Sequence, residues 1–369
     1  MDSKKTMFIV YDSVISRTLK SELNALSSYF EIQITIPAVT PQDKSGCLFA
    51  IHEVKQSGFS LFKPIGRKLT NIYNAIYYIF AASKIARNTP NDLTVIRSQM
   101  LPFMYKILLR NGTNTALGFH SALNFTFKGR IFNVISRVSA VLYDHVIVDT
   151  EFNIKTHKLP RNKCYVCGYG FEPRKFVYRK FESMDLIYVG VLTWRNVHET
   201  IYGFKRFFAE YGSRINMSYN IIGFVEGEYE HLLLKALQDA GAETPVKYHG
   251  WLEDDKVDAM FGKANIGVAF NRVNSSYSNF IPFKLHEYLL SGMAVTSTFS
   301  ELRKEVVSDI NGVIHVSSSE GFYQGLVHIY KHLDTYDSQK IRESDQKYSL
   351  EYNIKNIQVP MYQMIMEKL

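Results

Sequence analysis

Residues 282–295 read PFKLHEYLLSGMAV and predict a short helix followed directly by a β-strand. Pro282 suits the first position of a helix, where the N–H that it lacks would have no partner. The apolar residues recur at helical spacing and would share one buried face: Leu285, Tyr288 and Leu289. Gly292 ends the helix, and the strand follows at once. The two charged residues of the helix are left on its other side.

Those charged residues, Lys284 and Glu287, are three positions apart and lie on one side of the helix near its start. A helix N-terminus offers free N–H groups and the positive end of the helix dipole, which suits a phosphate, and a cation in the same turn strengthens this preference. A carboxylate one turn further along suits a ribose diol. The pair is therefore a candidate nucleotide site. The alternative is an ordinary ion pair on the surface of an amphipathic helix.

The same stretch resembles the nucleotide-sugar signature of GT-B glycosyltransferases of the family 4 type, whose variants often read P-x-K-x-x-E-Y with a Val after six further residues. The resemblance implies that Glu287 binds the ribose. It also implies that the loop ending in Asn279, Phe280 and Ile281 cradles the diphosphate and the sugar. The family usually carries a second acidic residue where this chain has Asn279, which can hydrogen-bond a sugar hydroxyl but brings no charge.

The resemblance also implies an architecture, the GT-B fold: α/β, with two Rossmann-like, doubly wound domains that face a cleft, and a C-terminal helix that crosses back to the first domain. On this basis residues 1–170 would form an acceptor-side domain. Residues 171–350 would bind the nucleotide-sugar donor, and residues 351–369 would be the returning helix.

The residues of the first domain support this architecture independently, because residues 7–36 predict a strand, a helix and a strand, which indicates a parallel sheet. The first turn lacks G-x-G-x-x-G, so it does not predict a dinucleotide site. The resemblance places Arg17 on the acceptor side. His120 would end a strand at the carboxyl edge where ligands bind, and the resemblance puts such a His near the transferred sugar. A surface Arg at a helix start and a structural His are the alternatives.

Residues 186–196, LIYVGVLTWRN, predict a strand and a glycine turn before a helix, an arrangement that suits phosphate. They resemble the family pattern Y-V-G-x-L. Gly190 would let the backbone approach the ligand, and Arg195 would chelate the diphosphate; an exposed turn Arg is the alternative. Residues 246–252, VKYHGWL, resemble the family's V-x-F-x-G-x-V. The resemblance implies a base pocket there, formed by His249, Gly250, Trp251 and Leu252.

The composition of the 369-residue chain, 46% hydrophobic and 21% charged, is that of a folded globular protein with room for two domains. It contains no run of 18 apolar residues, so we expect no transmembrane helix, and the polar start predicts no signal peptide. Cys164 and Cys167 have C-x-x-C spacing, but without a second pair we expect two buried residues and not a metal or redox site. A cytoplasmic protein fits these features.

The net charge of +8 is unevenly distributed. Residues 1–150 hold 17 Lys or Arg against 9 Asp or Glu, whereas residues 151–369 hold 26 of each. A one-sided basic half suggests an anionic partner, which could be a membrane surface, a lipid-linked phosphate or a nucleic acid. Nucleic acid would leave the motifs of the charge-balanced half unexplained, so we do not expect it. The aromatic segment 58–87 could lie on the inner face of an anionic membrane or be a core face.

These features together predict a glycosyltransferase of the hexosyltransferase class, which moves a sugar from a nucleotide-diphosphate sugar to a glycan acceptor. We expect a lipid-linked acceptor in surface polysaccharide synthesis, and the family implies retention. The expected catalytic residues are His120, Arg195 and Lys284, and no metal or other cofactor is expected, since no Asp-x-Asp motif was found. A sugar epimerase of the same fold and a non-catalytic nucleotide-sugar-binding or scaffold subunit are the alternatives. The second is favoured by Asn279.

Overall fold

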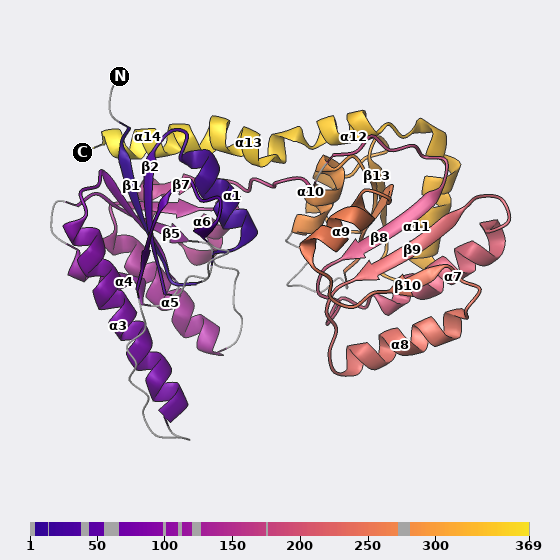
Figure 1. Cartoon of the computed structure of the whole chain (residues 1–369), viewed down its shortest axis with the longest axis horizontal. Coiled ribbons are helices and arrows are strands. Elements are labelled where there is room, and N and C mark those ends of the chain that lie inside the picture. The colour runs from indigo at the N-terminus through magenta and orange to yellow at the C-terminus, as the bar shows by residue number, and fades with distance from the viewer. Residues whose placement is uncertain are drawn as a thin grey trace. The chain divides into compact units, whose positions relative to one another are not determined.

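The computed structural model describes residues 4–13, 15–37, 44–54, 66–98, 101–109, 113–119, 127–174, 176–271 and 281–368, with the backbone alone for 66–71 and 127–133. The chain divides into two compact units. Unit 1 consists of Met1–Gly170 and Leu350–Leu369, and unit 2 of Phe171–Ser349 (Figure 1). Among the helices of the described ranges, none is long and apolar enough to span a membrane.

Unit 1 is built on a parallel sheet of seven strands in the order β3-β2-β1-β4-β5-β6-β7. The strands are β1 (Thr6–Tyr11), β2 (Glu31–Ile36), β3 (Ala50–Glu53), β4 (Leu93–Arg97), β5 (Thr115–Phe119), β6 (His145–Val148) and β7 (Cys164–Val166). The helices between them are α1 (Arg17–Leu26), α3 (Gly66–Asn88), α4 (Pro102–Leu108), α5 (Phe127–Leu142), α6 (Glu151–His157) and the short η1 (Arg161–Lys163). The chain runs from β1 out to β3 and returns to the other side of β1, so the sheet is doubly wound.

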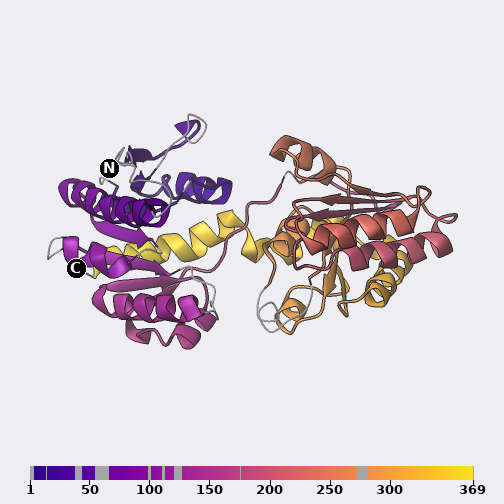
Figure 2. The same ribbon diagram turned by 90° about the horizontal axis from the view of Figure 1, so that it is seen from below.

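Both faces of this sheet are covered by helices, because side chains alternate along each strand. Met7 and Ile9 point into one core with α1 and the C-terminal segment, whereas Phe8 and Val10 point into the other core with α3, α4 and α5. The C-terminal segment is one helical run, yellow in Figures 1 and 2. It comprises α13 (Leu350–Asn353), the π-helical η5 (Ile354–Gln358) and α14 (Val359–Glu367).

A buried ion pair ties this C-terminal run to the sheet of unit 1. Arg97, at the end of β4, donates from Nη2 to Glu22 Oε1 of α1 at 2.8 Å and to the hydroxyl of Tyr362 in α14 at 3.2 Å. Burial alone would lower the pKa of Arg97, but the Glu22 charge and Tyr362 hold it well above its usual value. The guanidinium therefore stays charged and links three elements far apart in sequence.

Unit 2 is built on a parallel sheet of six strands in the order β10-β9-β8-β11-β12-β13. The strands are β8 (Met184–Val189), β9 (Met217–Ile222), β10 (Val246–Tyr248), β11 (Ile266–Ala269), β12 (Ala294–Thr298) and β13 (Gly312–His315). The helices are α7 (His198–Tyr211), α8 (Glu228–Ala240), α9 (Asp254–Phe261), α10 (Phe283–Leu290), α11 (Ser319–Lys331) and α12 (Ser338–Ser344), with short turns η2 (Leu302–Glu305), η3 (Leu333–Thr335) and η4 (Gln346–Tyr348). The prediction of two doubly wound α/β sheets is confirmed.

We predict that Glu22→Gln destabilises unit 1 by about 3 kcal/mol, because it leaves the Arg97 cation buried without its counter-ion. For a unit of this size that corresponds to a loss of about 6–12 °C in Tm. Thermal unfolding followed by circular dichroism measures it. The control is Glu151→Gln, which breaks the exposed pair with Arg161 and should cost at most about 1 kcal/mol. An equal loss of Tm in the two variants would show that the buried ion pair contributes no more to stability than the exposed one.

Candidate functional site

The candidate site lies where the strand order of unit 2 reverses, at the carboxyl ends of β8 and β11. The chain leaves β8 toward β9 and β10 and comes back to β11 on the other side. Ligands of doubly wound sheets bind at such a switch point, because the loops after the two central strands diverge there. Gly190 follows β8, Asn271 follows β11, and Thr298 ends the neighbouring β12.

Glycines allow the loops at this edge to approach one another closely. Gly190 has φ 134°, and a Cβ there would lie 3.3 Å from Lys284 Nζ. Gly223 follows β9 with φ 146°, and a Cβ there would lie only 1.8 Å from the Gly190 carbonyl oxygen. A side chain at Gly190 would meet Lys284 of α10, and one at Gly223 would force the turns after β8 and β9 apart. The close packing of these turns is therefore a property of unit 2, and the approach of the Gly190 backbone to a ligand stays a prediction.

Helix α10 is held in place by large side chains on its inner face. Tyr288 lies over Gly267 of β11, where an added Cβ would come within 2.3 Å of the ring. Its hydroxyl accepts a hydrogen bond from the Val189 N–H at 2.9 Å, at the end of β8. His286 is buried, with Nδ1 2.9 Å from Asp345 Oδ2 and its ring stacked on Phe171 at 4.5 Å. The helix therefore presents its first turn to the strand ends in a fixed position.

Lys284, in that first turn, places its ammonium out of contact with solvent. Nζ lies 3.5 Å from the centre of the Tyr188 ring. It makes no hydrogen bond to any residue of the described ranges, although the residue as a whole is only half-buried. Burial lowers its pKa well below the usual value, Arg195 and Arg303 lower it further, and Glu287 opposes them. An ammonium in such surroundings is costly unless an anion joins it.

Arg303 completes a group of three cations that we call the cationic cluster: Arg195, Lys284 and Arg303. Arg303 lies in η2 with 1% exposure, and its Nη1 donates to the Thr298 carbonyl oxygen at 2.7 Å and to the Thr298 hydroxyl. Its Nε has no partner in the part of the chain that the structure describes. Burial, and then Arg195, lower the pKa of Arg303 to about 10. The three cations thus lie within one another's electrostatic field.

The backbone around Arg195 is strained in the way that functional loops often are. Trp194 and Asn196, on either side of it, both adopt left-handed conformations, with φ 63° and 54°. Each such residue costs about 1–2 kcal/mol relative to the usual backbone conformation, so the surrounding structure must enforce the turn. Arg195 is half-buried, and its assignment to the diphosphate stays a prediction.

Further polar atoms without partners gather at the same edge. Asn271 is 1% exposed, and within the described ranges its Oδ1 accepts no hydrogen bond. His315 ends β13 with Nδ1 2.7 Å from the Val316 carbonyl oxygen, and its Nε2 is likewise without a described partner. Burial lowers the pKa of His315 to about 4, so the ring is neutral and Nε2 is an acceptor. Buried polar groups left unpaired in this way cost about 1–3 kcal/mol each, which a polar ligand would relieve.

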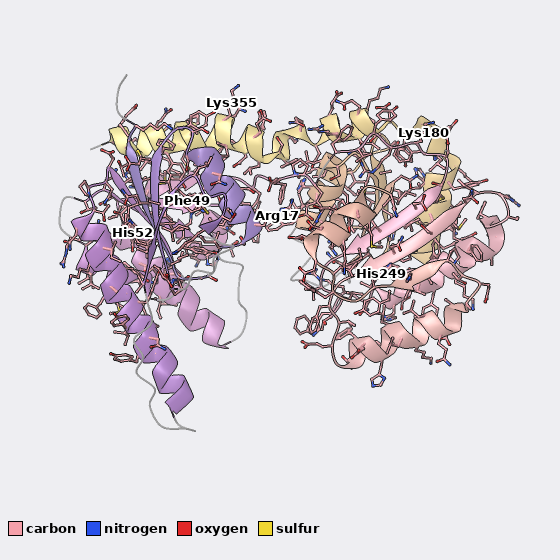
Figure 3. The ribbon with its side chains drawn as sticks, viewed as in Figure 1. Arg17, Phe49, His52, Lys180, His249 and Lys355 are labelled. Carbon is pink, nitrogen blue, oxygen red and sulfur yellow. The ribbon has the colours of Figure 1, made fainter. Side chains whose placement is uncertain are left out.

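The segment predicted to bind a base comes to this same edge of unit 2. The Gly223 N–H donates to the Gly250 carbonyl oxygen at 2.8 Å, and Gly250 has φ 66°. His249 is labelled in Figure 3. Its Nε2 lies 2.8 Å from Asn220 Oδ1, and burial lowers the pKa of the ring. Trp251 is 68% exposed, whereas Leu252 packs against the core. An exposed indole beside two glycine turns is a surface on which a planar base can stack.

The structure places the other predicted site residues as follows. Glu287 is half-buried one turn after Lys284, and its charge acts on the pKa of that lysine. Ile281 packs at the edge of the core of unit 2. His120, Asn279 and Phe280 lie outside the described residues. Arg17 is the exposed first residue of α1 in unit 1 (Figure 3); the capping role belongs to Ser16, whose hydroxyl accepts from the Leu19 N–H.

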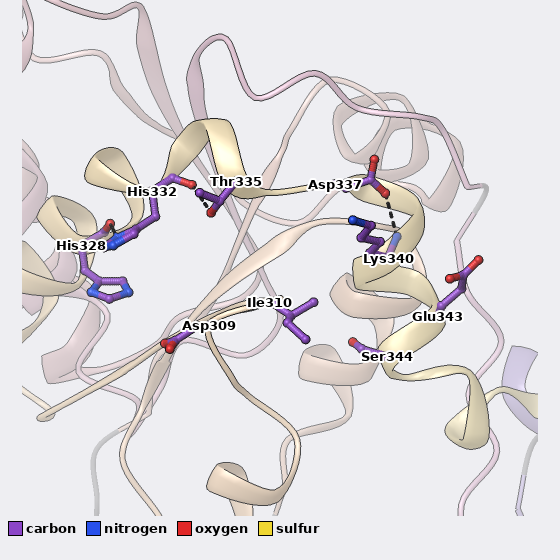
Figure 4. Close-up of a pocket in the computed structure, with 9 residues that line it drawn as sticks. All are labelled: Asp309, Ile310, His328, His332, Thr335, Asp337, Lys340, Glu343 and Ser344. Carbon is purple, nitrogen blue, oxygen red and sulfur yellow. Dashed lines mark hydrogen bonds between the residues drawn. The ribbon is translucent and has the colours of Figure 1, made fainter.

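Unit 2 also contains a cavity of about 760 Å³ that holds none of the cationic cluster. It is lined by Asp309, Ile310, His328, His332, Thr335, Asp337, Lys340, Glu343 and Ser344 (Figure 4). Its charges are mixed, and the rings of His328 and His332 lie 4.4 Å apart. No group of three or more His, Cys, Asp or Glu residues that could hold a metal ion occurs in the described ranges. Lys284 Nζ, Arg303 Nε and Asn271 Oδ1, which are buried without described partners, lie at the sheet edge and not among the residues that line this cavity, so we assign the candidate site to the sheet edge.

No protein-family model matches the sequence, and no curated protein matches it significantly. Solved structures do match the fold over essentially the whole chain. A glycosyltransferase from Rickettsia africae superposes with a TM-score of 0.70 at 12% identity, covering 100% of both chains. Anabaena HepE in complex with UDP gives 0.71 at 12% identity, covering 98% of this chain and 100% of that one. The apo lipopolysaccharide outer core galactosyltransferase WaaB gives 0.67 at 12%, covering 99% and 100%. The chain therefore has the GT-B fold.

We predict that Lys284→Met stabilises the ligand-free protein at pH 7 by about 1–3 kcal/mol, because it removes a buried cation without a hydrogen bond. The folded-state pKa of Lys284 lies below its unfolded value, near 10.4. The destabilisation of the wild type is therefore fully present below the folded pKa. This destabilisation disappears as the pH rises from the folded pKa to the unfolded pKa. The difference in unfolding free energy between the variant and the wild type therefore shrinks between those two pH values. Urea unfolding across this range measures the difference.

Lys304→Met is the matched control, since Lys304 is a largely exposed neighbour of the same edge. Its stability difference from the wild type should stay near zero at every pH. A Lys284→Met protein less stable than the wild type at pH 7 would contradict the assignment of an ammonium buried without a hydrogen bond.

Proposed function

We propose that this protein is a glycosyltransferase that moves a sugar from a nucleotide-diphosphate sugar to a glycan acceptor, with the diphosphate held by the cationic cluster. The observation that carries the proposal is the Lys284 ammonium, buried without a hydrogen bond among the described residues and within the fields of Arg195 and Arg303. A diphosphate supplies the missing negative charge and several acceptor oxygens. Its phosphates would raise the pKa of Lys284 again, so the lysine would bind it as a cation.

The same cations support the chemical step. In the transfer, the bond between the anomeric carbon and the β-phosphate oxygen of the donor breaks, and its electron pair stays on that oxygen. The acceptor hydroxyl oxygen bonds to the anomeric carbon, and its proton passes to the departing diphosphate or to solvent. Negative charge therefore grows on the departing diphosphate, where the preorganised Arg195, Lys284 and Arg303 can stabilise it in surroundings of low polarity.

The remaining donor contacts follow from the neighbouring residues. Glu287, one turn along α10, is proposed to accept hydrogen bonds from the ribose diol, and Trp251 to stack on the base. Gly190 would let backbone atoms approach the phosphates. Asn279 and Phe280 are proposed to contact the sugar, with His120 and Arg17 on the acceptor side. Anabaena HepE was solved with UDP and glucose, so UDP is the first nucleotide to test.

The finer features of the proposal rest on the family resemblance and on the fold shared with WaaB, a lipopolysaccharide outer core galactosyltransferase. We propose a lipid-linked acceptor in surface polysaccharide synthesis, transfer of a hexose with retention, and no metal requirement. A non-catalytic nucleotide-sugar-binding subunit is the second candidate, because Asn279 stands where the family has an acidic residue. Release of free nucleotide with the acceptor present separates the two.

We predict that one of UDP, GDP, ADP and CDP stabilises the wild type in a thermal-shift assay. At about 100 times its Kd it should add about 2.7 kcal/mol, or roughly 5–11 °C. Glu287→Ala and Arg303→Leu should lose most of this shift. Lys340→Ala, in the cavity lined by His328 and His332, should retain it. Loss of the shift in Lys340→Ala alone would move the nucleotide to that cavity, and no shift with any nucleotide would sink the proposed donor site.

We also predict that Arg195→Ala lowers kcat for nucleotide release by roughly 10²–10³, as removal of a single oxyanion contact does. The donor would be the sugar of the base found by thermal shift. Arg206→Ala, which removes an exposed Arg of α7, is the control and should keep full activity. An unchanged kcat in Arg195→Ala would exclude that residue from the chemical step.

A further inference from the structure

Three neighbouring helices of unit 1 share an unusual charge composition. Together α3, α4 and α5 carry eight Lys or Arg residues and no Asp or Glu. The acidic residues of unit 1 therefore lie elsewhere in the sequence. Helix α4 packs between α3 and α5, and all three cover the same face of the seven-stranded sheet (Figure 1). They form one continuous surface, which we call the α3–α5 face.

Apolar and aromatic side chains of α3 point away from the core on this face. Ile72, Ile76 and Phe80 follow one another at intervals of four residues, and Ile72 and Phe80 are 55% and 51% exposed. Tyr73 and Tyr77 lie beside them with their rings stacked 6.5 Å apart. The opposite side of the helix is buried, with Tyr78, Ile79 and Ala82 in the core. An α-helix that is apolar on both sides belongs in a fully apolar environment, but one side of α3 has no protein cover among the described residues.

The row of exposed apolar side chains on α3 is followed along the helix by cationic residues, and α5 carries a similar combination. Lys84 comes four residues after Phe80 and Arg87 one turn later, and both are exposed. On α5, Val134, Val138 and Val141 are each more than half exposed. Arg137 lies among them and is also exposed. The α3–α5 face therefore combines aliphatic and aromatic side chains with long cationic ones whose heads can extend beyond the apolar layer.

We propose that the α3–α5 face docks this protein on a membrane surface rich in anionic lipid. Aliphatic groups would enter the boundary of the acyl chains, tyrosines would lie at headgroup level, and the cations would contact lipid phosphates. Charge complementarity selects this occupant over a second copy of the chain. Lys106 of α4 pairs with Asp144, but Lys84, Arg87 and Arg137 are exposed, so two such faces would bring an excess of positive charge together. The inference rests on the proposed function, because a lipid-linked acceptor would lie in the membrane on which the protein docks. Vesicle binding can nevertheless be tested separately, since it requires neither donor nor catalysis.

The test is flotation with vesicles of phosphatidylcholine alone and with vesicles that also contain phosphatidylglycerol. The wild type should float with the second kind, and its recovery should fall as salt is raised. Lys84→Gln with Arg87→Gln should weaken binding roughly fivefold for each cation removed. Ile72→Ser with Phe80→Ser should abolish flotation at low protein concentration, since the apolar anchors are lost.

The matched control lies on α8 of unit 2, which also has exposed leucines beside a lysine but carries three acidic residues. Leu232→Ser, Leu234→Ser and Lys235→Gln together should leave flotation unchanged. Hydrogen exchange of the wild type gives a readout that needs no variant, because vesicles should protect α3 and α5 selectively.

Equal flotation with both kinds of vesicle, or equal loss in the α8 control, would overturn the proposal. A wild type that forms dimers by light scattering, and that Ile72→Ser with Phe80→Ser converts to monomers without any vesicle binding, would assign the face to self-association instead. The nucleotide shift is measured on the same variants. If it persists while flotation fails, the docking surface is wrong and the proposed donor site stands.

Discussion

The Lys284 ammonium lies 3.5 Å from the centre of the Tyr188 ring, without solvent contact and without a hydrogen bond among the described residues. Much of unit 2 serves to keep it there. Tyr288 over Gly267 and the His286–Asp345 pair fix α10, and two glycine turns bring the ends of β8 and β9 against it. Folding energy from a large apolar core offsets the cost of that one cation. A protein that held no anion at this place would gain stability from any apolar residue there.

Each cation of the cluster is held by a different structural element. Lys284 sits on a helix packed on the sheet, Arg195 on a strained turn, and Arg303 on a short helical turn bonded to the last residue of β12. Because each rests on a separate element, the fold can hold like charges close together although they repel. Preorganisation of this kind removes the cost of arranging the groups when a ligand arrives.

Sequence patterns were sufficient to predict the doubly wound sheets, because a chain of alternating strands and helices can pack in few other ways. They also identified Gly190, Arg195, Lys284 and Glu287 as candidates from two local motifs. They could not show that Lys284 loses solvent, because its burial depends on Tyr188, nearly a hundred residues earlier. Arg303 was missed for a similar reason. Nothing in the local sequence marks a residue that bonds to the end of a strand and whose charge acts on two distant cations.

If the protein transfers sugars as proposed, the cationic cluster also affects turnover. In a nucleotide-sugar donor the β-phosphate is joined to the α-phosphate by an anhydride and to the sugar by an ester, so it carries one negative charge. In the free nucleoside diphosphate the oxygen that held the sugar can also ionise and adds a second charge. A site built of Arg195, Lys284 and Arg303 would thus hold the spent nucleotide at least as firmly as the fresh donor. Departure of the nucleotide, rather than bond exchange at the sugar, would then set the pace of each cycle. Free nucleoside diphosphate would then act as a product inhibitor of this protein.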